Sequence, residues 1–306
     1  MWTRRDFLKT SAGGLAAATF WQMGCGGGGN GGGGGNSDVA GIYGVGEAYL
    51  IFDASGDVFE VCPADHKVLR RRPDGSLVWQ IGELGMSPGQ LNHPTALVAD
   101  RQGQLYVVDH GNSRIEVYGA DGDYLRQVGG RDDDGIDDPM ELDFARALAL
   151  DSGQRLYVCD TRDNQIQVFE RDGTPAGAFG EFGEGAEGLN NPIALAIDHE
   201  DNLHILDQGN YRVQVFDRGG QHQRSYGAYG TDAGQFLLPR SIAIDSDGRS
   251  YVADAAAFRI AVFAPDGQPI DEIEVRFDDF QLGSPLQLAW APDEQLYVTA
   301  VPTSMT

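Results

Sequence analysis

The chain has 306 residues and is strongly acidic, with 46 aspartate and glutamate residues against 22 lysine and arginine residues and a formal net charge of −24. Such a charge repels phosphate backbones and anionic lipid headgroups, which argues against nucleic acid as a partner and leaves a covalent lipid anchor as the only expected route to a membrane. It favours cationic partners, divalent metals or a salty medium.

Residues 1–25 predict an export signal rather than a folded element. Arg4 and Arg5 are followed by Phe-Leu-Lys, and then by a weakly apolar stretch from Ser11 to Phe20 that is too short to span a membrane as a stable helix. The pattern closely resembles a twin-arginine signal, which implies export of an already folded protein. The alternative is a chance pair of arginines near the start of the chain.

A possible lipid attachment site follows the export signal. Gln22-Met23-Gly24-Cys25 resembles a lipoprotein cleavage box, in which Gly24 is the small residue before Cys25, although Gln22 departs from the usual aliphatic position. Residues 26–37 are almost pure glycine, and we expect a flexible tether because such a segment buries no apolar surface. Lipidation of Cys25 would hold a folded domain close to a membrane, in the periplasm or at the cell surface. The alternative is ordinary signal cleavage without a lipid.

The remainder of the chain, residues 38–306, repeats one short phrase six times. The copies are Val58–Cys62, Leu105–Asp109, Leu156–Asp160, Leu203–Asp207, Ser250–Asp254 and Leu296–Ala300. Their last residues lie 47, 51, 47, 47 and 46 positions apart. A period in the forties, with short strands and turn signals inside each unit, is typical of a β-propeller. The sequence therefore predicts one all-β domain with six blades.

The second unit shows how one repeat makes one blade. Four segments have the composition and alternation of strands: Pro94 to Asp100, Gln104 to Asp109, Arg114 to Tyr118 and Tyr124 to Val128. Asp121-Gly122 is a strong hairpin signal between the last two of them, because glycine readily adopts the positive φ of such a turn. Each unit is therefore expected to form a four-stranded antiparallel blade.

The last unit has room for only its first two strands, because six residues follow Ala300. The segment from Asp38 to Val45 precedes the first complete blade and is available to supply a missing strand. We therefore expect N- and C-terminal segments to join in one blade, which closes the ring and removes an exposed strand edge. The expected product is a monomeric propeller.

A recurring set of polar residues follows the second strand of several units. The clearest sets are Asp109, Asn112 and Arg114; Asp207, Asn210 and Arg212; and Asp254, Ala257 and Arg259. Together with the upstream prolines and downstream Asp-Gly or Gly-Gly turns, these sets resemble NHL repeats, and the likeness covers residues 48–300. A chemical site is built once, whereas a turn must be built in every blade. We therefore interpret these residues as structural and assign no catalytic residue.

Strand order predicts which loops share a face of the ring. Connections between units and turns between second and third strands lie on one face, where propellers usually carry function. The residues just after the strand-opening positions are Thr95, Arg146, Ile193, Arg240 and Leu286. We take Thr95, Arg146 and Arg240 as candidate ligand-binding residues at the channel mouth, where the two arginines would clamp a carboxylate or phosphate. The alternative is that both arginines pair with local aspartates.

The connector before the third unit is four residues longer than its counterparts and strongly acidic. Its carboxylates surround a glycine, which suits calcium because this ion takes six to eight oxygen ligands from a sharply turning loop. The candidate calcium ligands are Asp132, Asp134 and Asp137. The alternative is a solvated acidic loop.

Three histidines belong to the same predicted face: His66, His93 and His110. Three imidazoles are a ligand set that zinc accepts with one position left open. The alternative is that these histidines are polar turn residues. No cofactor is certain from the sequence, and calcium is favoured over zinc.

These patterns predict an exported, membrane-tethered propeller that serves as a binding or protein-interaction module for a protein, peptide or small ligand. The alternative is a metal-dependent lyase or hydrolase with its site at the channel mouth, resembling peptidylglycine amidating lyase. That resemblance implies histidine ligands just after the strand-opening positions. This chain has Thr, Arg, Ile, Arg and Leu there, so the catalytic residues do not carry over.

Overall fold

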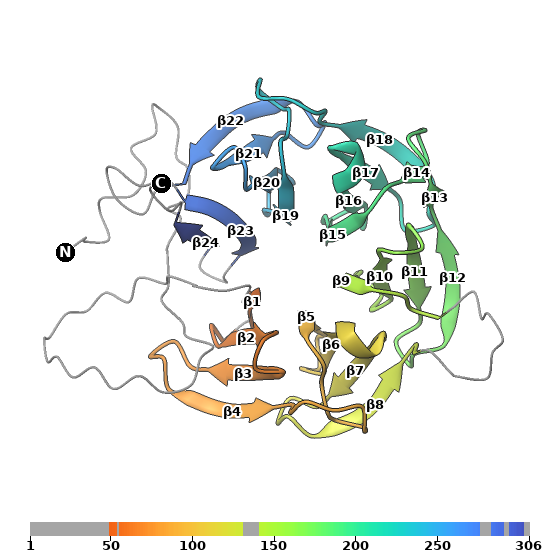
Figure 1. Cartoon of the computed structure of the whole chain (residues 1–306), viewed down its shortest axis with the longest axis vertical. Helices are drawn as coiled ribbons and strands as arrows, with labels where there is room; N and C mark the ends of the chain where they lie inside the picture. Colours follow the sequence, from red (N-terminus) through yellow and green to blue (C-terminus); the bar gives the residue numbers. More distant parts are fainter. Residues whose placement is uncertain (1–48, 54, 131–140, 276–282, 291–293, 303–306) are drawn as a thin grey trace, which may run out of the picture.

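The structure is a computed structural model that describes residues 49–53, 55–130, 141–275, 283–290 and 294–302. These residues form a ring of antiparallel sheets (Figure 1). Blade 1 contains β1 (Tyr49–Phe52), β2 (Val58–Cys62), β3 (Lys67–Arg71) and β4 (Leu77–Ile81). Blade 2 contains β5 (Pro94–Ala99), β6 (Leu105–Asp109), β7 (Arg114–Tyr118) and β8 (Tyr124–Val128). Blade 3 contains β9 (Ala145–Leu150), β10 (Leu156–Asp160), β11 (Gln165–Phe169) and β12 (Pro175–Phe179).

Two further blades have the same composition. Blade 4 contains β15 (Pro192–Ile197), β16 (Leu203–Asp207), β17 (Arg212–Phe216) and β18 (His222–Tyr226). Blade 5 contains β19 (Pro239–Ile244), β20 (Ser250–Asp254), β21 (Arg259–Phe263) and β22 (Pro269–Glu274). Short 3₁₀ helices follow β6 and β16, namely η1 (His110–Asn112) and η2 (Gln208–Asn210). Between blades 3 and 4, β13 (Glu181–Phe182) pairs in parallel with β14 (Gly188–Leu189).

The prediction of an all-β propeller with four-stranded antiparallel blades is confirmed, but the predicted number of blades is not. The described residues contain five four-stranded blades rather than six. The last repeat contributes only a two-stranded sheet, β23 (Gly283–Trp290) with β24 (Leu296–Pro302). The count falls short because this repeat has no third or fourth strand among the described residues. The segment Asp38 to Val45, predicted to complete it, lies outside them.

The two-stranded sheet closes the ring against blade 1. The Leu50 amide donates to Gln287 Oε1 at 2.6 Å, and Gln287 Nε2 donates to the Leu50 carbonyl at 3.0 Å. The side-chain amide of β23 thereby satisfies both backbone groups of one residue of β1. The Phe52 and Tyr297 rings pack beside this contact with their centroids 4.4 Å apart. Strands from opposite ends of the described chain thus lie side by side (Figure 1).

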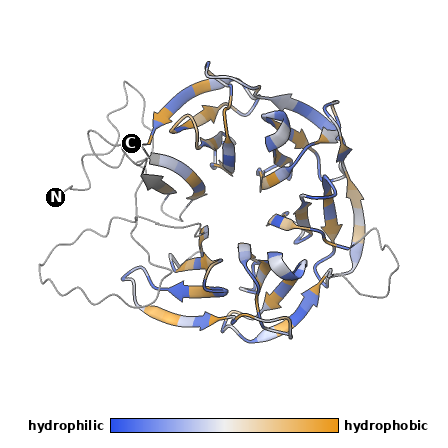
Figure 2. Ribbon diagram, viewed as in Figure 1, coloured by the Kyte–Doolittle hydropathy of each residue, from blue (hydrophilic) through white to orange (hydrophobic). Residues whose placement is uncertain are grey.

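The core is divided into six apolar clusters, one between each pair of neighbouring sheets around the ring. Hydrophobic residues recur along the strands of every blade (Figure 2). The second strand of each complete blade is buried at every position, because neighbouring blades cover both of its faces. This double cover explains why the repeated phrase is a nearly continuous apolar run. Among the described residues, no helix has the length and apolarity needed to cross a membrane.

The recurring Asp and Arg residues tie blades 2, 4 and 5 to the connectors before them. Asp109 accepts hydrogen bonds from the Asn92 amide at 2.6 Å, from Asn112 Nδ2 at 2.7 Å and from Arg114 Nε at 2.9 Å. The other guanidinium nitrogens of Arg114 donate to backbone carbonyls of the preceding connector, including that of Gln90. Asp207 and its arginine repeat the arrangement in blade 4. Buried charge that is paired in this way supports the interpretation that these residues are structural.

Blade 3 departs from this arrangement. Asp160 occupies the buried aspartate position, but Gln165 stands where blades 2, 4 and 5 have the arginine. Among the described residues, the Asp160 carboxylate accepts hydrogen bonds only from the Asp143 amide at 3.1 Å and from Gln167 Nε2 at 2.8 Å. Burial, together with the nearby Asp163 carboxylate, raises the pKa of Asp160 to about 7. Blade 3 therefore holds an acid that stays largely protonated below neutral pH.

Candidate functional site

A β-bulge near the start of five first strands, namely β5, β9, β15, β19 and β23, turns one side chain out of the sheet. In these five strands, pairing with the second strand skips the residue after the opening position. The skipped residues are Thr95, Arg146, Ile193, Arg240 and Leu286. An extra residue in one strand has no partner across the ladder, and the bulge re-aims its side chain. The same local irregularity is therefore repeated around the inner edge of the ring.

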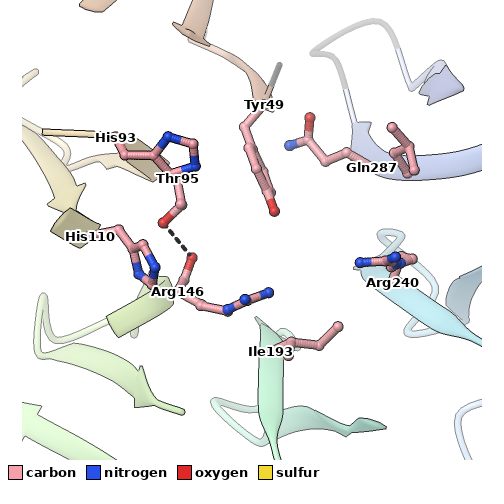
Figure 3. Close-up of a pocket in the computed structure, with 9 residues that line it drawn as sticks. Tyr49, His93, Thr95, His110, Arg146, Ile193, Arg240 and Gln287 are labelled. Carbon is pink, nitrogen blue, oxygen red and sulfur yellow. Dashed lines mark hydrogen bonds between the residues drawn. The ribbon is translucent and has the colours of Figure 1, made fainter. Parts of the chain in front are cut away.

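All five bulged residues line one cavity of about 170 Å³ at the centre of the ring (Figure 3). The remaining lining residues are Tyr49, His93, His110 and Gln287. A cavity of roughly 150 Å³ accommodates a molecule of the size of benzene, so this space suits a ligand of comparable size. The side chains of Arg146 and Arg240 enter the cavity from opposite sides, and the Tyr49 hydroxyl points between them (Figure 3).

The cavity is positively charged although the protein as a whole is acidic. The described residues that line it include no aspartate or glutamate. Within the described part of the chain, the guanidinium groups of Arg146 and Arg240 form no ion pair and no hydrogen bond, unlike that of Arg114. The alternative from the sequence, pairing of both arginines with local aspartates, is therefore not seen there. Two unneutralised cations that face a small space are suited to hold a carboxylate, phosphate or sulfate group.

Two polar lining residues also make contacts that join blades 2 and 3. The Thr95 hydroxyl donates to the backbone carbonyl of Arg146 at 3.2 Å. His110 Nδ1 lies 2.9 Å from the Ala145 carbonyl, and because a carbonyl only accepts, Nδ1 carries the proton. The Phe144 ring packs against the imidazole with centroids 5.1 Å apart. Burial lowers the pKa of His110, and the positive charge of Arg146 lowers it further, so the imidazole is neutral at pH 7.

The three candidate zinc ligands are not arranged as a metal site. His66 is not among the residues that line the cavity, and its Nδ1 accepts a hydrogen bond from the His93 amide at 3.0 Å. Two blades further on, Asn164 Oδ1 accepts a hydrogen bond from the Asn191 amide in the same way, at 2.8 Å. His66 is therefore a turn residue in the place of an asparagine. The rings of His93 and His110 lie 6.1 Å apart, and the described residues contain no group of three or more His, Cys, Asp or Glu placed to hold a metal.

Several predicted features fall on residues that the structure does not describe. The candidate calcium ligands Asp132, Asp134 and Asp137 lie in the segment 131–140, outside the described residues. Cys25, the export signal and the glycine tether lie outside them as well. Calcium binding, export and lipidation therefore stay predictions.

Two lining residues were not predicted from the sequence. Tyr49 belongs to the first described strand and Gln287 follows the bulged Leu286 of the last sheet. Both reach the cavity because the ring closes between β1 and β23. Neither residue belongs to the repeated phrase, and we find no signal in the sequence that would have selected them.

Comparison with known proteins identifies the repeat. The NHL repeat model matches residues 91–118 and 142–169, which include most of blade 2 and of blade 3. These two segments are similar to NHL repeats. It is 32% identical to human E3 ubiquitin-protein ligase TRIM32 over 103 residues, which cover 31% of this chain and 15% of the ligase. It is 30% identical to human NHL repeat-containing protein 3 over 82 residues, covering 26% of this chain and 24% of that protein. The matches span a quarter or less of these relatives.

Solved propeller structures resemble the whole ring at low sequence identity. A streptogramin B lyase matches with a TM-score of 0.62 and 14% identity, covering 82% of this chain and 75% of the lyase. Virginiamycin B lyase from Staphylococcus aureus also has a TM-score of 0.62 and 14% identity, with 86% and 80% covered. A gluconolactonase from Xanthomonas campestris has a TM-score of 0.61 and 17% identity, with 82% of both chains covered. These similarities show the fold alone.

Proposed function

We propose that this propeller is a binding module for a small anionic ligand, which it holds in the central cavity between Arg146 and Arg240. One observation carries the proposal: two arginines without partners among the described residues face a cavity that lacks acidic lining, in a protein of net charge −24. A bound anion would supply the negative charge and the hydrogen-bond acceptors that these two guanidinium groups lack. Ile193 and Leu286 add apolar surface, so the ligand would combine an anionic group with a short apolar part.

The proposal is tested by titrating the purified protein with sulfate and with small mono- and dicarboxylates in a calorimeter. Charge-assisted hydrogen bonds contribute roughly 1.5–3 kcal/mol each. Arg146→Gln and Arg240→Gln should therefore each weaken binding by about ten- to a hundredfold, and added neutral salt should weaken binding to the wild type. Arg101→Gln is the matched control, because Arg101 is an exposed arginine outside this cavity. No binding of any probe, or equal losses in all three variants, would overturn the proposal.

The proposed setting of this module is outside the cytoplasm. The supporting features are the paired arginines of the export signal, the cleavage box at Cys25 and the glycine tether. Arg4→Lys combined with Arg5→Lys should leave the protein in the cytoplasm, and Cys25→Ser should release an exported form from the membrane fraction. A peptide or protein that presents an anionic group would reach the cavity from the face of the ring that carries the connections between units. Unchanged fractionation of both variants would contradict this placement.

A second candidate function is a lyase or hydrolase that acts in the same cavity. It is favoured by the neutral His110 beside the two arginines, and by the lyase and lactonase names of the similar propellers. The discriminating measurement is the metal content of protein purified after export. Zinc near one ion per chain would favour the metal-dependent enzyme. Calcium, with a melting shift lost in a protein carrying Asp132→Ala and Asp134→Ala, would instead place a metal in the acidic connector.

A further inference from the structure

His110 occupies a position that joins neighbouring blades in three places around the ring. In each case a side chain just after the second strand donates to the carbonyl of the residue that opens the next blade. His110 Nδ1 donates to the Ala145 carbonyl at 2.9 Å, and Gln208 Nε2 donates to the Pro239 carbonyl at 2.8 Å. Thr161 supplies a hydroxyl for the same purpose at 2.7 Å. The contact therefore needs only a donor, and blade 2 alone among these three fills the position with a titratable ring.

The imidazole retains a nitrogen that the contact between blades does not use. Because Nδ1 carries the proton, Nε2 of the neutral ring has a free lone pair. Within the described residues Nε2 has no hydrogen-bond partner, and His110 lines the same cavity as Arg146 and Arg240. The edge contact with Phe144 and the bond to Ala145 hold the ring in place. A preorganised nitrogen thus stands beside the two arginines.

The charges around His110 make its protonation sensitive to an anion. The charged and titratable groups that face it are Arg146 on β9, His93 before β5 and Asp109 on β6. Asp109 is engaged by its own arginine, so Arg146 is the cation left unneutralised beside the ring. In the empty cavity this cation and burial both disfavour the imidazolium form. An anion bound to Arg146 would cancel the repulsion and offer the imidazolium a partner.

We propose that His110 is a third ligand-contacting residue of the cavity and that it takes up one proton when an anion binds. The inference rests on the proposed function, because it presumes that an anion occupies the space between the two arginines. Two guanidinium groups and an imidazolium present three positive charges to the ligand. The site would therefore prefer a compact dianion, such as a short dicarboxylate or a sulfate or phosphate group, to a monocarboxylate of similar size.

Proton uptake makes binding depend on pH with a defined sign. Binding that is favoured by protonated His110 is strongest below the pKa of His110 in the unoccupied protein, weakens as pH rises from that pKa to the pKa of the complex, and is constant above it. A rise of one pKa unit on binding corresponds to about a tenfold difference in affinity between the two limits. We expect at least this difference across the range in which imidazoles titrate, roughly pH 5 to 8.

The test uses sulfate as the probe, because its charge does not change over that range. Calorimetric titrations of the full chain at several pH values, each in two buffers of different ionisation enthalpy, measure affinity and proton uptake together. The wild type should take up at least about half a proton per sulfate at the pH midway between the pKa values of the free and the occupied protein, and should bind about tenfold more tightly at the acidic limit than at the alkaline limit. Direct NMR titration of the His110 ring with and without sulfate should show its pKa rise by about one unit.

Two variants make the test specific. His110→Gln keeps a donor for the Ala145 carbonyl, as Gln208 does in blade 4, but removes the titrating ring. It should bind sulfate with little dependence on pH and without proton uptake. His66→Asn is the matched control, because Asn164 fills the equivalent place in blade 3. It should behave as the wild type does.

The outcomes separate this inference from the proposed function. Sulfate binding that depends on Arg146 but proceeds without proton uptake, and is unchanged in His110→Gln, would refute the role of His110 and leave the anion site standing. Absence of sulfate binding, or binding indifferent to Arg146→Gln, would remove the anion site itself. Should His110→Gln fail to fold, the NMR titration of the wild type still decides, because an unshifted ring in saturating sulfate contradicts the proposal.

Discussion

Asp160 is expected to make this protein lose stability as the pH rises from about 4 to about 7. The side chain is fully buried in blade 3, where no arginine of the described residues pairs with it, and its pKa is raised from 3.8 to about 7. In an acid with a raised folded-state pKa, the native state holds the proton more tightly than the unfolded chain does. The stability it contributes is therefore complete below the unfolded pKa and is lost as pH rises through the folded pKa.

The size of this effect follows from the shift. Roughly three pKa units at 1.36 kcal/mol per unit give about 4 kcal/mol as the loss in unfolding free energy between pH 4 and pH 7. Asp160→Asn removes the titration. The asparagine Oδ1 still accepts from the Asp143 amide, and rotation of the Gln167 amide would offer its Oε1, which has no partner among the described residues, to the new Nδ2. As the pH rises over this range, the free energy of unfolding of the variant should therefore increase relative to that of the wild type by about 1 kcal/mol per pH unit.

Urea unfolding followed by circular dichroism near pH 4.5, 6 and 8 measures the difference. Asp207→Asn is the contrasting variant, because Asp207 pairs with Arg212 at 2.8 Å. It should lose roughly 3 kcal/mol at pH 8, since it leaves a largely buried guanidinium without its carboxylate. Parallel pH profiles for the wild type and Asp160→Asn would refute the reasoning, because they would show that Asp160 ionises normally in the fold.

Three further changes test the fold. Gln287→Ala removes both hydrogen bonds that close the ring and should cost about 1–3 kcal/mol, measured as a lowered melting temperature. Arg114→Met leaves a buried carboxylate unpaired and should cost about 3–5 kcal/mol in urea unfolding, whereas exposed Arg72→Met should change stability by about 0.5 kcal/mol or less. Gly227→Ala adds a Cβ that collides with an aromatic side chain, whereas Gly75 has a similar positive φ but open space around it. Gly227→Ala should therefore lower the free energy of unfolding by about 1–3 kcal/mol more than Gly75→Ala does.

The sequence alone determined the elements that each repeat builds for itself. The buried second strand, the Asp-Gly hairpins and the Asp and Arg residues that anchor the connectors recur with the period of the chain, because every blade must satisfy the same backbone groups. The same periodicity identified the positions of Thr95, Arg146 and Arg240 after each opening residue. Their convergence on one cavity could be expected from strand order, since the repeated unit orients each blade in the same way.

Only the tertiary structure decided what happens between units. The bulge that turns Arg146 and Arg240 into the cavity is a matter of strand register, which composition does not reveal. The lack of acidic partners for these arginines depends on which side chains meet across the ring. Tyr49 and Gln287 join the site because β1 and β23 meet, through residues 237 positions apart in the chain. The physical reason is that a repeat encodes local strand pairing, whereas ring closure and the number of complete blades depend on contacts between distant parts of the chain.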